Sequence, residues 1–199
     1  MDSFKTIRQT TVEILFKEKK SKFYAQAFLV DDETSIKNIL ETLRKLHPNA
    51  GHVCYAYRID PVQPKWRAND DGEPNNSAGM PIYGQIQSHE LYNVLVTVTR
   101  YFGGVKLGVG GLISAYKTAA QLALESAEII EKTIEKTFTL TFDYAQMNKV
   151  MRIIKEKNIF INNQNLTENC QLTVTISMQH AQAFSSWFAD VFPAIKISD

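Results

Sequence analysis

The sequence predicts an α+β protein made of two domains, and three observations support this. Its 199 residues suffice for one large domain or two small ones. Residues 4–130 mix β-rich runs with segments of helical periodicity. The composition then changes near Glu131, and from Thr133 the pattern restarts as strand, helix, strand, strand, helix, strand. We therefore expect an N-terminal domain over residues 1–132 and a C-terminal domain over residues 133–199.

The N-terminal domain is expected to begin with strands and one amphipathic helix. Two or three strands are expected within residues 4–30, with a lysine-rich turn at Lys19–Lys22. A helix is expected over residues 32–46, because apolar side chains recur there at helical spacing. Its start has two candidate capping residues, Asp32 and Thr34.

The middle of this domain alternates strands with loops and helices. The pattern predicts a strand over residues 53–59 and a polar loop over residues 66–79. A short helix follows, with Pro81 near its first position. A long β-branched strand over residues 91–102 and a helix over residues 112–130 complete the domain.

The C-terminal domain has the element order of ferredoxin-like folds. Helices are expected over residues 145–157 and 179–190. Strands are expected over residues 137–142, 159–165, 170–178 and 194–198.

Composition limits the classes of function. The net charge is +1, so no global field draws the chain to nucleic acid or to an anionic membrane, and any charged site must be a local patch. Two distant cysteines without a CxxC motif fit a reducing cytosol. The N-terminus is too charged for a secretory signal, and no apolar run approaches membrane-spanning length. We expect a cytoplasmic protein without a membrane partner.

The most unusual stretch is Thr97–Tyr116, where five of the nine glycines lie within nine residues between a strand and a helix. A strand, a glycine turn and a helix N-terminus together offer free N–H groups to an anion. Lys106 lies inside the turn and Lys117 in the helix. The spacing matches neither a P-loop nor GxGxxG. Phosphate contact and a tight packing turn therefore both remain open.

Two other groups of residues are candidates for chemical sites. The acidic run Asp70–Pro74 could hold magnesium, but it lacks a calcium-loop spacing and suits a turn with solvated carboxylates better. His52 and Cys54 share a face of one strand, yet no third group orients them for nucleophilic catalysis. We therefore predict no catalytic residue, metal or cofactor.

Basic residues gather around the first predicted turn. Four lysines lie within six positions, and they suit either phosphate contact or a solvated turn. Nearby aromatic side chains could provide stacking surfaces for bases. The phosphate interpretation gains weight if folding brings this turn and the glycine-rich stretch to one face.

Several blocks of sequence together resemble the IMPACT family, including its bacterial YigZ-like members. The blocks are the turn KSKF, the strand GHVCYAYR, and the segments DDGEPNNSAGMPI and VTRYFGGVKLGVGGLISAY. One block departs from the family pattern: Asn75-Asn76-Ser77 replaces the usual Ser-Gly-Thr. Asparagine tolerates left-handed backbone better than most residues, so we expect the turn to persist.

The resemblance implies both a fold and a setting. It implies an N-terminal β-α domain like that of a ribosomal protein and of elongation factor G domain IV. A ferredoxin-like domain similar to domain V of that factor would follow. Eukaryotic members of the family look like regulators of translation under amino-acid stress. The motif loop that the resemblance marks comprises His52, Asp70, Asp71, Gly72, Glu73, Pro74, Tyr101 and Phe102.

Together these observations predict a non-enzymatic regulator of translation that binds RNA, the ribosome or a translation-associated partner. The residues expected to contact nucleic acid or phosphate are Lys19, Lys20, Lys22, Arg58, Arg67, Arg100, Gly103, Gly104, Lys106, Gly108, Gly110, Gly111 and Lys117. The alternative is an enzyme that acts on a phosphorylated small molecule or nucleotide, using the glycine-rich loop with magnesium. A pure protein-interaction module is a third hypothesis.

Overall fold

The computed structural model describes residues 2–167, 169–192 and 194–198, and it confirms the α+β class. The chain divides into two compact units. One comprises Phe4–Lys132, and the other comprises Thr133–Asp199 with Met1–Ser3. Each unit has its own apolar core.

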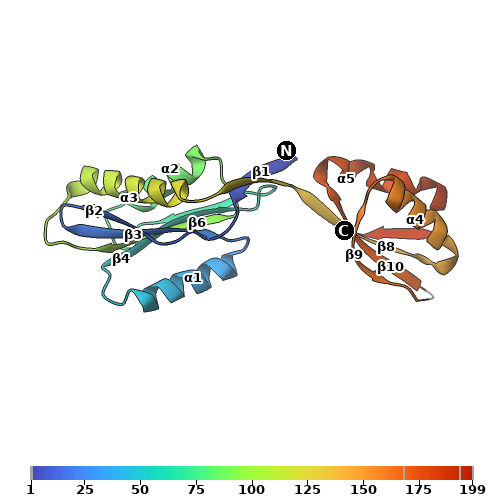
Figure 1. Cartoon of the computed structure of the whole chain (residues 1–199), viewed down its shortest axis with the longest axis horizontal. Helices are drawn as coiled ribbons and strands as arrows, with labels where there is room; N and C mark the ends of the chain where they lie inside the picture. Colours follow the sequence, from blue (N-terminus) through green and yellow to red (C-terminus); the bar gives the residue numbers. More distant parts are fainter. Residues whose placement is uncertain (1, 168, 193, 199) are drawn as a thin grey trace. The chain divides into compact units, whose positions relative to one another are not determined.

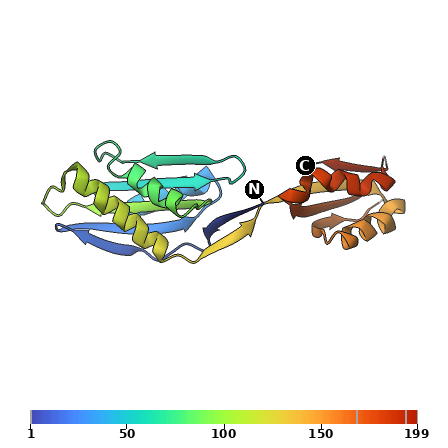
Figure 2. The same cartoon turned by 90° about the horizontal axis from the view of Figure 1, so that it is seen from above.

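The first unit contains a five-stranded antiparallel sheet in the order β2-β3-β6-β4-β5 (Figures 1 and 2). Residues 22–29 of β3 pair with the whole length of β6, and β4 pairs with the other side of β6. Strand β6 is therefore central, and all but its last residue are buried. The strands are β2 (Ile14–Glu18), β3 (Ser21–Leu29), β4 (His52–Ile59), β5 (Lys65–Asn69) and β6 (Val94–Tyr101).

Helices cover both faces of this sheet (Figure 1). Helix α1 (Glu33–Leu46) lies on one face, and Asp32 caps it by accepting a hydrogen bond from the Ser35 amide. Helices α2 (Gly79–Ser88) and α3 (Gly108–Glu125) lie on the other face. Alanines line both sides of the contact between α3 and β3, so helix and sheet pack closely; they are Ala25, Ala27, Ala115, Ala119, Ala120 and Ala123.

The last helix of the first unit differs from its prediction at both ends. Helix α3 begins at Gly108 and ends at Glu125, whereas a helix over residues 112–130 was expected. Its first turn therefore contains three of the five clustered glycines. Residues after it form β7 (Ile129–Thr133), which pairs with β1 (Ser3–Ile7). Strand pairing outweighs the helical pattern there, as tertiary contacts often outweigh propensity.

The second unit is ferredoxin-like, as predicted. Its four antiparallel strands follow the order β11-β8-β10-β9. Its core is formed by inward-facing residues of the sheet and by the helical segments. Its elements are β8 (Glu135–Asp143), η1 (Tyr144–Gln146), α4 (Met147–Glu156), β9 (Phe160–Asn165), β10 (Asn169–Ser177), α5 (Met178–Phe184), η2 (Ser185–Val191) and β11 (Ile195–Ser198).

In the part of the chain that the structure describes, no helix combines the length and the apolar character needed to cross a bilayer.

Two glycines of α2 provide a matched test of packing against the sheet. A Cβ at Gly79 would lie 2.5 Å from the Asn69 amide nitrogen of β5, whereas a Cβ at Gly84 would meet no atom within 4 Å. We expect Gly79→Ala to lower the free energy of unfolding by about 1–3 kcal/mol. Gly84→Ala should raise it by up to about 1 kcal/mol. Urea denaturation measures both, and equal effects would contradict this packing.

Candidate functional site

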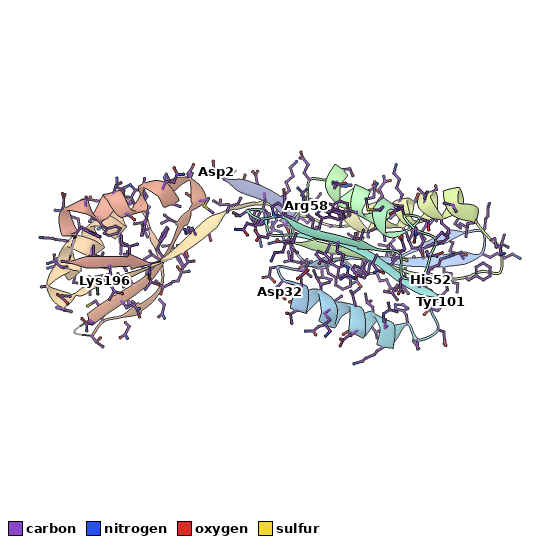
Figure 3. The ribbon with its side chains drawn as sticks, turned by 180° about the vertical axis from the view of Figure 1, so that it is seen from behind. Asp2, Asp32, His52, Arg58, Tyr101 and Lys196 are labelled. Atoms are coloured by element: carbon purple, nitrogen blue, oxygen red, sulfur yellow. The ribbon has the colours of Figure 1, made fainter. Side chains whose placement is uncertain are left out.

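The predicted basic residues lie at several separate places on the first unit. Figure 3 shows His52 and Tyr101 at one end of the sheet and Arg58 toward the other end. Arg58 donates a hydrogen bond to the Tyr92 hydroxyl and covers its ring. Arg67 lines a groove beneath α1, and Lys117 is exposed on α3. These three cations do not join the lysine turn.

Arg100 is buried, so it does not lie on the surface where phosphate contact was expected. Its Nη1 donates to Glu73 Oε1 at 2.5 Å, and the two side chains are only 7% and 4% exposed. The Tyr116 hydroxyl donates to the same Glu73 oxygen at 2.8 Å. A buried ion pair of this kind needs such extra hydrogen bonds to offset desolvation. The pair joins β6, α3 and the loop between β5 and α2.

The acidic loop, Asp70–Pro74, is held by its own carboxylates. Asp70 accepts hydrogen bonds from the amides of Asn76, Ala78 and Gly79, so its carboxylate caps the N-terminus of α2. Asp71 binds Arg44 and the Val53 amide. These carboxylates hold backbone amides and an arginine, so they are engaged within the protein and are not the freely solvated groups that the sequence suggested.

The turn after the acidic loop also fits its expectation. Asn76 has a φ of 60°, which is the left-handed conformation that asparagine tolerates. Asparagine therefore takes the position at which the family pattern has glycine. Among the described residues, no group of three or more His, Cys, Asp or Glu side chains is placed to hold a metal ion.

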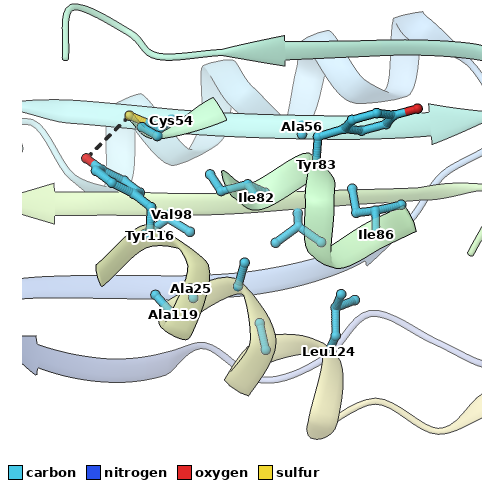
Figure 4. Packing of buried hydrophobic residues seen from close by; sticks show 14 of the residues in the cluster. Ala25, Cys54, Ala56, Ile82, Tyr83, Ile86, Val98, Tyr116, Ala119 and Leu124 are labelled. Carbon is cyan, nitrogen blue, oxygen red and sulfur yellow. Dashed lines mark hydrogen bonds between the residues drawn. The ribbon is translucent and has the colours of Figure 1, made fainter. Parts of the chain in front are cut away.

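His52 and Cys54 have different partners, which argues against a catalytic pair. The Cys54 thiol lies 3.4 Å from the Tyr116 hydroxyl (Figure 4). It donates a hydrogen bond to the Asp70 carbonyl at 3.0 Å. Burial raises the pKa of this thiol well above its ordinary value. The His52 ring bonds to the Asp71 carbonyl at 2.8 Å, and its Nε2 lies 3.9 Å from Glu73.

The glycine loop, Gly103–Gly111, is anchored to the lysine turn. A Cβ at Gly103 would lie 2.0 Å from the Lys20 carbonyl carbon, so only glycine fits. The Gly103 amide also donates to Ser21 Oγ at 3.2 Å. Lys19 and Lys20 form the two-residue turn between β2 and β3, with φ values of 43° and 69°. The turn and the start of the glycine loop therefore lie in contact.

The remaining glycines of the loop differ from Gly103. Gly104 and Gly108 adopt positive φ, at 82° and 72°, and a Cβ at either would meet open space. Gly110 and Gly111 lie inside the first turn of α3. The glycines were expected to let a ligand come close to the backbone. At Gly103, the close contact is instead with the backbone of Lys20.

Two hollows flank Phe102. One, which we name the lysine–tyrosine pocket, has a volume of about 430 Å³ and is lined by Lys20, Lys22, Tyr24, Tyr101 and Phe102. The other, which we name the glycine-loop cleft, has a volume of about 350 Å³. It is lined by His52, Glu73, Pro74, Arg100, Phe102, Lys106, Leu107, Gly108, Val109 and Leu112. Folding therefore gathers a subset of the predicted residues around one aromatic side chain.

Strand pairing explains how the lysine–tyrosine pocket forms. Lys22 of β3 lies opposite Tyr101 of β6 and opposite Lys17 of β2, so the three side chains share one face of the sheet. This face carries α1, because Tyr101 bonds to His47 at the end of that helix. Tyr24 follows two residues after Lys22 and shares that face. Lys19 lines a different hollow, beside α3.

A hydrogen-bonded cluster supports the aromatic side of this pocket. The Tyr101 hydroxyl bonds to His47 Nδ1 at 3.0 Å, and His47 Nε2 lies 3.1 Å from Glu13 Oε1. The Tyr24 ring packs against both His47 and Tyr101. Tyr24 is not among the residues predicted from the sequence, although its spacing from Lys22 on a predicted strand places both side chains on one face.

Comparison with known proteins matches both units. The Impact N-terminal domain matches residues 19–124, and a domain of unknown function, DUF1949, matches residues 140–192. IMPACT family member YvyE of Bacillus subtilis is 31% identical over 87% of this chain and 80% of the relative. IMPACT family member YigZ of Escherichia coli is 29% identical over 90% of this chain and 89% of the relative. A crystal structure described as a hypothetical protein aligns with 99% of this chain and 97% of its own, at a TM-score of 0.74 and 26% identity.

Removing one charge of the buried ion pair should strongly destabilise the first unit. We expect Glu73→Gln to lower the free energy of unfolding by about 3–5 kcal/mol, because Arg100 would remain charged and buried without a counterion. Glu128→Gln breaks the exposed pair with Arg8 and should cost less than about 1 kcal/mol. Chemical denaturation measures the loss in each variant. Similar losses of unfolding free energy would mean that burial does not determine how much an ion pair stabilises this unit.

The Cys54 thiol should be inert in the folded protein. Thiolate is the reactive form, and burial holds the pKa of Cys54 above its ordinary 9.0. Iodoacetamide at pH 8 should therefore modify Cys54 only after unfolding in urea, as peptide mass mapping can show. By linkage, the neutral thiol's contribution to stability is complete below pH 9.0 and is lost as the pH rises above it. Rapid modification of native Cys54 would contradict both expectations.

Proposed function

The chain belongs to the IMPACT family, and on this basis we propose that it is a non-enzymatic, cytoplasmic regulator of translation that binds unpaired segments of RNA. The family resemblance supports the setting in translation. The lysine–tyrosine pocket supports the kind of ligand, and it is the single observation on which this proposal depends.

The pocket has the two components that single-stranded nucleic acid requires. Lys20 and Lys22 would neutralise backbone phosphates, and the rings of Tyr24, Tyr101 and Phe102 would stack on bases. Among the described residues, neither lysine forms an ion pair, so both charges are available to a ligand. Phe102 is 58% exposed at the edge of the pocket, so its ring is open to a base.

The predicted residues divide into roles under this proposal. Lys20, Lys22, Tyr101 and Phe102 would contact RNA directly, and exposed Lys17 extends the basic strip along β2. Arg100, with Glu73, would hold the strand that carries Tyr101 in place. Arg58, Arg67 and Lys117 lie on other parts of the first unit and would not contact the same RNA segment.

The alternative enzymatic function receives less support from the geometry. It requires carboxylates that are free to hold magnesium. Asp70 and Asp71 instead bind backbone amides and Arg44, and Glu73 neutralises Arg100. We therefore do not place a reaction at this loop.

Salt-dependent RNA binding tests the proposal. A fluorescent single-stranded oligouridylate is titrated with the full chain at several salt concentrations, and its anisotropy is followed. The variant Lys20→Ala/Lys22→Ala would make two fewer phosphate contacts. The negative slope of log K against log salt should therefore become less steep by about 1.4. The affinity of this variant should fall at least tenfold at low salt.

The matched control removes two exposed lysines elsewhere. Lys117→Ala/Lys149→Ala makes the same change in net charge, so its affinity and slope should stay near those of the unchanged protein. Equal losses of affinity in both double variants would mean that RNA binding depends on net charge and not on the lysine–tyrosine pocket. An unchanged protein that does not bind RNA would overturn the proposal and favour a translation-associated protein as the partner.

A further inference from the structure

The glycine-loop cleft is a second hollow with a chemistry of its own. It lies between the acidic loop and the start of α3, on the other side of Phe102 from the lysine–tyrosine pocket. Its volume of about 350 Å³ falls within the range of small-molecule sites, roughly 300–1,000 Å³. The RNA-binding proposal does not use this cleft.

Apolar side chains form much of the cleft wall. Leu107 and Leu112 are buried beneath it, whereas Phe102 and Val109 remain 58% and 53% exposed at its edge. Pro74 lines the side formed by the acidic loop. Exposed apolar side chains gathered around a hollow indicate a ligand with an apolar body. A flat aromatic group could stack on the Phe102 ring.

Polar groups at the cleft indicate an anionic head on that ligand. Arg100 lines the cleft with its side chain 93% buried, and its Nε is buried with no hydrogen-bond partner among the described residues. An orphaned donor of this kind in a cleft is unusual in folded proteins. Lys106 adds an exposed positive charge at the edge.

The start of α3 supplies the third positive element. The helix begins at Gly108, which lines the cleft, and the residue at its N-cap is Leu107, whose apolar side chain cannot accept a hydrogen bond from the first amides. The amides of its first turn therefore lack intrahelical acceptors, and the helix dipole favours negative charge there. Because Glu73 already neutralises Arg100, the remaining charge suits one small anion.

We propose that the glycine-loop cleft binds a small aromatic anion, a phosphate ester or a carboxylate, with its ring against Phe102 and its anionic group near Lys106 and the first turn of α3. The site requires no metal and carries out no reaction. It is a binding site separate from the RNA surface, although Phe102 lines both hollows.

Isothermal titration of the full chain in EDTA tests this proposal with defined probes. Phenyl phosphate and benzoate represent the two anionic groups. As controls, inorganic phosphate lacks the aromatic ring and benzyl alcohol lacks the anionic group. At least one aromatic anion should bind saturably, and at least tenfold more tightly than inorganic phosphate or benzyl alcohol. The tighter of the two identifies the anionic group.

Variants place the binding in the cleft. Val109→Trp fills the exposed edge, and Lys106→Ala removes a charge; each should weaken the aromatic anion at least threefold without changing the thermal midpoint substantially. Lys117→Ala, on the exposed side of the same helix, should have no effect. Lys20→Ala/Lys22→Ala should weaken RNA binding at least tenfold but leave the affinity for the probe unchanged, so the failure of one proposal can be told apart from the failure of the other. Absence of saturable binding, or equal binding to Val109→Trp, would overturn this inference.

Discussion

The buried ion pair between Glu73 and Arg100 is the interaction on which the rest of this region depends. Each partner comes from a different segment of the chain, and Tyr116 of α3 completes the hydrogen bonding. A buried charge must be neutralised. If the acidic loop moved away from β6, either Glu73 or Arg100 would be left without its counterion. The acidic loop, the central strand and the third helix are therefore held together, and all three line the glycine-loop cleft. The lysine–tyrosine pocket shares only the end of the central strand with them.

Much of the fold follows from local patterns, and the exceptions have physical causes. The amphipathic helix before Pro48 and the ferredoxin-like order could be predicted, because periodicity and turn residues agree there with the tertiary structure. The limits of α3 could not. Glycines that suggest a loop lie in its first turn, and residues 129–133 become a strand through a partner more than a hundred residues away.

The candidate site shows a sharper limit of sequence-based inference. Residue type alone does not distinguish a surface arginine from a buried one, so Arg100 was grouped with cations that contact phosphate. Only the pairing of β6 with β3 and β4 places it opposite Phe23 and His52 and beneath Glu73. In contrast, the sequence did single out the lysine turn and the glycine-rich stretch as the two segments whose proximity would favour phosphate contact, and Gly103 brings them together.

The turn between β2 and β3 places two lysines where hairpins prefer asparagine and glycine. Both adopt left-handed backbone, which costs roughly 1–2 kcal/mol for each residue with a Cβ. A chain selected for stability alone would relax this strain, but the same exchange would remove two positive charges. Thermostability and cationic character therefore compete at these two positions, and a stabilised version of this protein would best be sought by changes elsewhere.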